Sequence, residues 1–171
     1  MKKVILMLAI GTSFMLSSCA STNVAKSQME TGKEVRGAWT LSDVSYQGLA
    51  NHQVQGNVKV TETVSSVFDM AKPECFVGST WNLVQNNKTG TYTFNTSDSA
   101  CPSGTAKIIW NIVEEGTTTY FTFKDVTGIK AKQNTAGYKL QVTNLSETNM
   151  TLSQDVRVDG KIAQVIYSFQ R

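Results

Sequence analysis

The 171-residue chain is poor in histidine and cysteine, the side chains most used for nucleophilic catalysis and metal binding. It contains one histidine, three cysteines and two prolines. His52 stands in the polar stretch "GLANHQVQGN", with no nucleophile elbow or second metal ligand around it. The sequence therefore predicts no catalytic residue, no metal site and no cofactor, and we expect a protein that is not an enzyme.

Other binding signatures are also scarce. No glycine-rich phosphate loop precedes a predicted helix. The only adjacent carboxylates, Glu114 and Glu115, fall at a predicted hairpin tip, where a solvated turn is expected. The 16 basic and 13 acidic residues nearly balance and form no basic cluster. Nucleic-acid binding is therefore not expected.

The N-terminus carries a targeting pattern. Lys2 and Lys3 precede an apolar run, "VILMLAIGTSFML", from Val4 to Leu16. A helix of that length spans roughly 20 Å, which is short of the ~30 Å hydrocarbon core of a bilayer. Residues 1–18 are therefore predicted to be a cleaved signal peptide rather than a membrane span.

The apolar run ends in "LSSC", which resembles the lipobox of bacterial lipoproteins and makes Cys19 the predicted lipidated residue. An ordinary signal peptide with an incidental cysteine is the alternative. Several acyl chains anchor a protein durably to a membrane. The residue after Cys19 is Ala20 rather than aspartate, which by resemblance to bacterial sorting rules favours the outer membrane, facing the periplasm. The polar residues 19–34 are predicted to be a flexible tether.

Cys75 and Cys101 remain once Cys19 is assigned to lipid. In an exported protein an even pair favours one disulfide, and two free thiols are the alternative. The bridge would close a loop of about 26 residues and contribute roughly 3 kcal/mol.

Residues 35–171 are predicted to be one all-β domain. Short runs with period-two alternation are separated by turn signals such as Glu115-Gly116 and Asp159-Gly160. The runs begin at 37–46, continue with a short candidate strand at 54–60 and resume from residue 79. The segment 62–71 has its apolar residues at helical spacing but also suits a strand. About eight or nine strands with at most one short helix favour an antiparallel sandwich or barrel.

The series "RGAWTL", "VFDMAKPECFVGSTWNL", "NNKTGTYTFN", "CPSGTAKIIWNI" and "LSETNMTLSQDVRVDGKIAQVIYSF" resembles small lipocalin-like lipoproteins of the Bacteroidetes group. The resemblance implies a single lipocalin-like barrel in which Trp39 caps the base and Cys75 pairs with Cys101. Lipocalins place an arginine from the last strand on that tryptophan. Arg171 is the last residue here, a departure that weighs against the contact.

Strand aromatics supply the candidate ligand site. They would either line a cavity for a small hydrophobic or amphipathic ligand or simply form the core of the barrel. The alternative function is a filled barrel that binds a protein partner of the cell envelope. The candidate lining residues are Trp39, Trp81, Tyr92, Trp110, Phe121, Phe123 and Tyr138.

Overall fold

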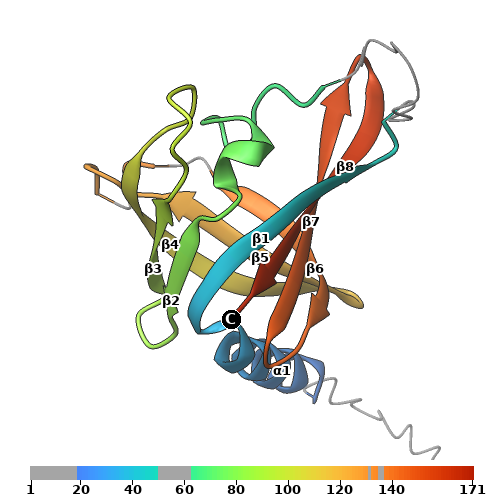
Figure 1. The fold of residues 1–171 in the computed structure, drawn as a ribbon. Helices are drawn as coiled ribbons and strands as arrows, with labels where there is room; N and C mark the ends of the chain where they lie inside the picture. Colours follow the sequence, from blue (N-terminus) through green and yellow to red (C-terminus); the bar gives the residue numbers. More distant parts are fainter. Residues whose placement is uncertain (1–18, 50–62, 131, 135–136) are drawn as a thin grey trace, which may run out of the picture.

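The computed structural model describes residues 19–49, 63–130, 132–134 and 137–171. Its main feature is a closed barrel of eight antiparallel strands, in which each strand pairs with the next and β8 pairs with β1 (Figure 1). The strands are β1 (Gly37–Gln47), β2 (Thr80–Val84), β3 (Thr89–Phe94), β4 (Gly104–Glu115), β5 (Thr118–Asp125), β6 (Tyr138–Leu145), β7 (Asn149–Val158) and β8 (Lys161–Gln170).

Alternation of side chains explains why these segments form a barrel. Along β8 the apolar side chains of alternate residues point inward and are buried, while their neighbours are half-buried or exposed. β4 alternates in the same way around Ile108, Trp110 and Ile112. Period-two burial places one face of every strand in the core, and closure removes the unpaired edges. The predicted all-β barrel is confirmed, with eight strands.

One predicted segment differs from the structure and another is not tested by it. The candidate strand at 54–60 lies outside the described residues. The described part of the 62–71 segment, residues 63–71, forms neither a helix nor a strand of the barrel. It makes a tight turn with an isolated bridge between Val67 and Ala71, and a short 3₁₀ helix, η1 (Pro73–Phe76), follows it.

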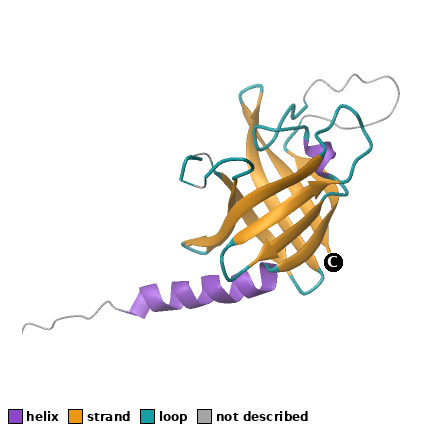
Figure 2. Ribbon diagram, turned by 90° about the vertical axis from the view of Figure 1, so that its left-hand side faces the viewer, coloured by secondary structure: helices purple, strands orange, loops and turns teal. Residues whose placement is uncertain are grey.

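The last turn of a helix, α1 (Cys19–Val35), packs through Val35 against one end of the barrel, which we call the closed end. Residues 19–34 are therefore helical, in contrast to the flexible tether that the sequence predicts. α1 extends outward from the end of the barrel opposite η1 (Figure 2). Within the described part of the chain, no helix is long and apolar enough to cross a membrane.

Trp39 joins α1 to the barrel at this closed end. Its indole Nε1 donates a hydrogen bond to the carbonyl oxygen of Val35, 2.8 Å away. The guanidinium of Arg171 lies 3.8 Å from the centre of the indole ring, so the cation–π contact that the terminal position of Arg171 weighed against is formed. Such contacts contribute about 0.5–2 kcal/mol.

Candidate ligand site at the open end of the barrel

The predicted lining residues divide into two groups. Trp39 lies at the closed end, where it is 1% exposed beneath α1 and Arg171. The other six belong to one network of ring contacts inside the barrel. In that network the neighbouring ring centres lie 4.8–5.9 Å apart, in the pairs Trp81–Tyr92, Trp81–Phe123, Phe121–Phe123, Trp110–Phe121 and Phe123–Tyr138.

These separations are those of packed aromatic pairs. The rings therefore pack against one another as a core and do not stand around an open space. The six side chains are brought together as predicted, but in this conformation a ligand at the heart of the network would have to displace a ring.

Phe68 completes this network from outside the strands. Its ring, 5% exposed, lies within the end of the barrel beside η1 and opposite α1, which we call the open end. Its centre is 5.0 Å from Phe123, 5.2 Å from Tyr138, 5.3 Å from Phe76 and 5.5 Å from Tyr167. Sequence reasoning did not place Phe68 in the candidate site. The helical spacing of Val64, Val67, Phe68 and Ala71 correctly marked buried residues but not the turn that buries them.

The backbone at Phe68 has an unusual conformation. Phe68 and Asp69 have φ values of 55° and 51°, and the amide of Met70 donates a hydrogen bond to the carbonyl of Val67. Two consecutive positive φ values characterise a type I′ turn, which normally contains glycine or asparagine. A bulky side chain in the left-handed region costs about 1–2 kcal/mol. Packing of the Phe68 ring offsets this cost.

Two further contacts hold this turn in the barrel mouth. The hydroxyl of Tyr138 donates a hydrogen bond to the carbonyl oxygen of Phe68, 2.6 Å away. A disulfide joins Cys75 in η1 to Cys101, which confirms the predicted bridge. We call residues 64–76 the plug segment, because the ring of Phe68 fills the open end of the barrel.

The rim around the plug segment is polar. The hydroxyl of Tyr92 donates to a carboxylate oxygen of Asp125 at 3.1 Å, and that of Tyr46 donates to the carboxylate of Glu74. Burial, reinforced by these carboxylates, raises the pKa of Tyr92 and of Tyr46 above the usual value near 10. Both phenols are therefore neutral hydrogen-bond donors at neutral pH.

A pocket of about 310 Å³ opens at this rim beside the plug segment. Its lining combines the apolar side chains of Leu49 and Val64 with Lys72 and the Tyr46–Glu74 pair. This mixed lining suits an amphipathic group.

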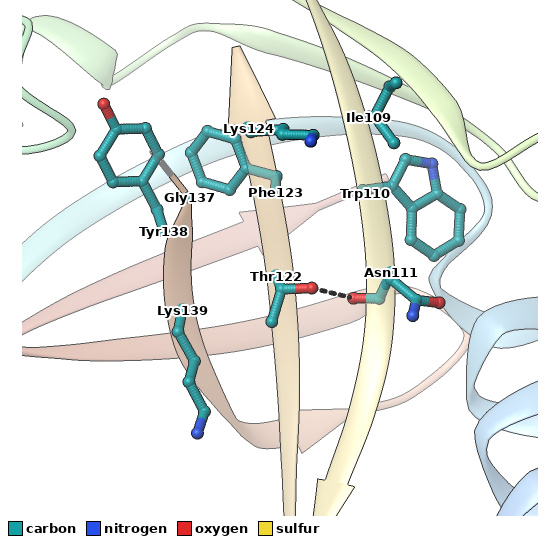
Figure 3. A pocket seen from close by; sticks show the side chains of 9 residues that line it. All are labelled: Ile109, Trp110, Asn111, Thr122, Phe123, Lys124, Gly137, Tyr138 and Lys139. Atoms are coloured by element: carbon teal, nitrogen blue, oxygen red, sulfur yellow. Dashed lines mark hydrogen bonds between the residues drawn. The ribbon is translucent and has the colours of Figure 1, made fainter. Parts of the chain in front are cut away.

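The outer surface of the barrel carries two adjoining apolar hollows. A hollow of about 330 Å³ crosses β4, β5 and β6, and Figure 3 shows the residues that line it. The hydroxyl of Thr122 donates to the backbone oxygen of Asn111 on its floor, 3.2 Å away. Ile109 lies at one edge and also borders a neighbouring hollow of about 380 Å³, so the two apolar hollows adjoin.

The residues considered for catalysis from the sequence are His52 and the adjacent Glu114 and Glu115. His52 lies outside the described residues. Glu115 forms an ion pair with Lys139 at 2.6 Å, on the surface. Across residues 19–49, 63–130, 132–134 and 137–171, no three histidine, cysteine or acidic side chains are grouped as metal ligands.

Comparison with known proteins found no matching family model, no matching curated protein and no matching solved structure.

Proposed function

We propose that this protein is a non-catalytic, lipid-anchored binding protein for one small apolar or amphipathic molecule. The ligand enters the open end of the barrel, and the Phe68 ring swings out to make room for it. One observation carries this proposal: the open end is filled by a ring on a strained turn that lies outside the barrel strands. A strained segment at a cavity mouth is a common feature of ligand clamps.

The chemistry of the ligand follows from the surroundings of Phe68. The space vacated by its ring would be bounded by Phe76, Phe123 and Tyr167, so the buried part of the ligand is apolar. The rim offers the hydroxyl of Tyr46 and the carboxylate of Glu74, so a polar group is accommodated only at the outer end.

The anchor in this proposal is a lipid on Cys19, at the outer membrane and facing the periplasm, in keeping with the lipocalin-like lipoproteins that the sequence resembles. Cys19 is the first residue of α1, and α1 lies at the closed end of the barrel. Attachment there would leave the open end directed away from the anchor, so a ligand could be exchanged with the surrounding solvent.

Ligand binding is tested by titrating the full chain with the fluorescent apolar probe N-phenyl-1-naphthylamine. We expect saturable binding and a Kd at least tenfold lower in Phe68→Gly, which removes the ring and suits the positive φ. Phe169→Ala is the matched control, because it removes a buried ring near the closed end. Equal affinity in the wild type and Phe68→Gly, or an equal gain in Phe169→Ala, would overturn the proposal.

The anchor is tested by fractionating cells that express Cys19→Ser. We expect the variant to leave the membrane fraction, whereas the Cys75→Ser, Cys101→Ser double variant stays there. Retention of Cys19→Ser in the membrane fraction would contradict lipid anchoring at this residue.

The second candidate is a filled barrel that binds an envelope protein, and the adjoining apolar hollows on the outer wall favour it. Crosslinking in intact cells should then yield a stable adduct that Ile109→Glu abolishes. Ile162→Glu is the control, since Ile162 is an apolar residue of β8 that is 62% exposed. An adduct that survives Ile109→Glu would eliminate this surface as the interface.

A further inference from the structure

A pocket of about 540 Å³ lies at the closed end of the barrel, far from the plug segment. It is formed where α1 meets the turn between β2 and β3 and the adjacent part of β4. The side-chain amide of Gln85 donates a hydrogen bond to the backbone oxygen of Met29, 3.1 Å away, and so fixes the turn against the helix. The pocket is lined by Gln28, Met29, Lys33, Arg36, Gln85, Asn86, Lys88 and Asn111.

The charges in this pocket all have one sign. Lys33, Arg36 and Lys88 line it, and no carboxylate is among its lining residues. In the part of the chain that the structure describes, no ion pair joins any of the three to an acidic side chain. Lys33 and Arg36 lie at the carboxyl end of α1, where the helix dipole favours cations. That field helps three like charges to remain close together in the absence of a bound anion.

Lys88 is built into the pocket rather than extended into solvent. Its ammonium lies 4.6 Å from the centre of the Trp110 ring, and burial lowers its pKa. A Cβ atom at Gly32 would come within 3.1 Å of this ammonium, so the glycine lets the lysine approach the helix closely.

The backbone conformation of Lys88 also indicates that this lysine is placed in the pocket at a cost to the turn. Its φ of 56° is in the left-handed region, which glycine or asparagine adopts at lower cost. The hairpin would therefore form more readily with glycine at this position. A lysine there places a partly desolvated positive charge in the lining of the pocket, although it makes the turn less stable.

Four side-chain amides complete the lining: Gln28, Gln85, Asn86 and Asn111. Amide NH₂ groups are neutral donors, and ammonium and guanidinium groups donate charge-assisted hydrogen bonds. A tetrahedral oxyanion can accept from several such donors at once. Met29, which is 50% exposed at one edge, adds an apolar surface beside the polar floor.

We propose that this pocket binds an anionic phosphate group, as a free phosphate or phosphomonoester or as the phosphodiester of a lipid headgroup. Lys88 and Arg36 contact its oxygens, and the amides orient it. The site is separate from the open end of the barrel and stands whether or not an apolar ligand binds there.

The test measures binding to the full chain by isothermal titration calorimetry with soluble probes of both sources. Inorganic phosphate and glycerol 3-phosphate represent the free anion. Dihexanoyl phosphatidylglycerol, kept below its micelle concentration, represents the headgroup, and dihexanoyl phosphatidylcholine is its zwitterionic counterpart. The variants are Lys88→Gly, which suits the positive φ at this position, and Arg36→Gln. Lys130→Gln removes one exposed positive charge from the loop between β5 and β6 and is the matched control.

We expect one saturable anion site whose affinity falls roughly tenfold or more in Lys88→Gly and in Arg36→Gln, because each loses a charge-assisted hydrogen bond. Lys130→Gln should bind as the wild type does. Tight binding of the free phosphates identifies a soluble ligand, and tight binding of phosphatidylglycerol alone identifies a headgroup. If none of the anions binds at millimolar concentration, or if Lys130→Gln weakens binding as much as Lys88→Gly, the site does not exist as proposed.

Discussion

Replacing Phe68 by alanine or by glycine separates the packing of its ring from the strain of its backbone. The buried ring contacts four others, and truncating such a side chain to alanine costs about 3–5 kcal/mol. Alanine keeps the left-handed strain of about 1–2 kcal/mol, which glycine relieves. The glycine variant has a more flexible unfolded chain, which lowers its free energy of unfolding by about 0.5–1 kcal/mol. Phe68→Gly should therefore be more stable than Phe68→Ala by about 0.5–1 kcal/mol.

Urea unfolding followed by tryptophan fluorescence measures both effects. With a slope of about 2 kcal/mol/M, Phe68→Ala should unfold at a urea concentration roughly 1.5–2.5 M lower than the wild type. The control is the same pair of substitutions at Phe169, in the extended strand β8, where alanine should be more stable than glycine. If glycine is the less stable at both positions, or if Phe68→Ala loses less than about 1 kcal/mol, the plug segment is not held as the structure indicates.

Three further predictions concern stability. The double variant Cys75→Ser, Cys101→Ser should lose roughly 3–3.5 kcal/mol of unfolding free energy in urea, from loop entropy over the 26-residue separation, and should no longer respond to reductant. Arg171→Gln should lose about 0.5–2 kcal/mol and increase hydrogen exchange at Trp39 Nε1, whereas an unchanged exchange rate would show that the cation–π contact contributes nothing. Tyrosine ionisation, followed by ultraviolet absorbance, should begin well above pH 10 for the groups whose folded pKa is raised. Stability from these phenols is complete below their unfolded pKa near 10 and falls as pH rises toward their folded pKa. Ionisation of two or more of the five tyrosines near pH 10 in the native protein would contradict their burial. The tyrosines with a raised pKa are Tyr46, Tyr92, Tyr138 and Tyr167.

The sequence alone was enough to predict the strands, and the reason is local. Residues that alternate between core and solvent leave a period-two pattern, as around Trp110 in β4 and Tyr167 in β8. Turn residues such as Asp159-Gly160 then separate one strand from the next. The pairing of Cys75 with Cys101 was predictable for a similar reason, because only two cysteines remain after Cys19 is set aside.

The helix α1 was not predicted because its sequence has the polar composition of a linker. Only its last turn is strongly buried, at Val35, and apart from the hydrogen bond between Trp39 and Val35 the described contacts that hold it to the barrel come from residues distant in sequence. Gln85 contacts Met29 across the β2–β3 turn, and Arg171 reaches the carbonyl of Glu34 from the other end of the chain. Such tertiary contacts can stabilise a helix whose own composition does not signal it.

Both candidate sites also depended on tertiary structure. The spacing of Val64, Val67 and Phe68 marks burial, but a left-handed backbone at a phenylalanine has no sequence signal, so the plug in the barrel mouth could not be foreseen. Likewise, Lys33, Arg36 and Lys88 form no run in the sequence, and only the packing of α1 against the β2–β3 turn brings them into one pocket. The sequence by itself determined the strands, because period-two alternation is a pattern of neighbouring residues. The closure of the strands into a barrel, the plug at its open end and the cationic pocket at its closed end were decided by contacts between residues far apart in the chain.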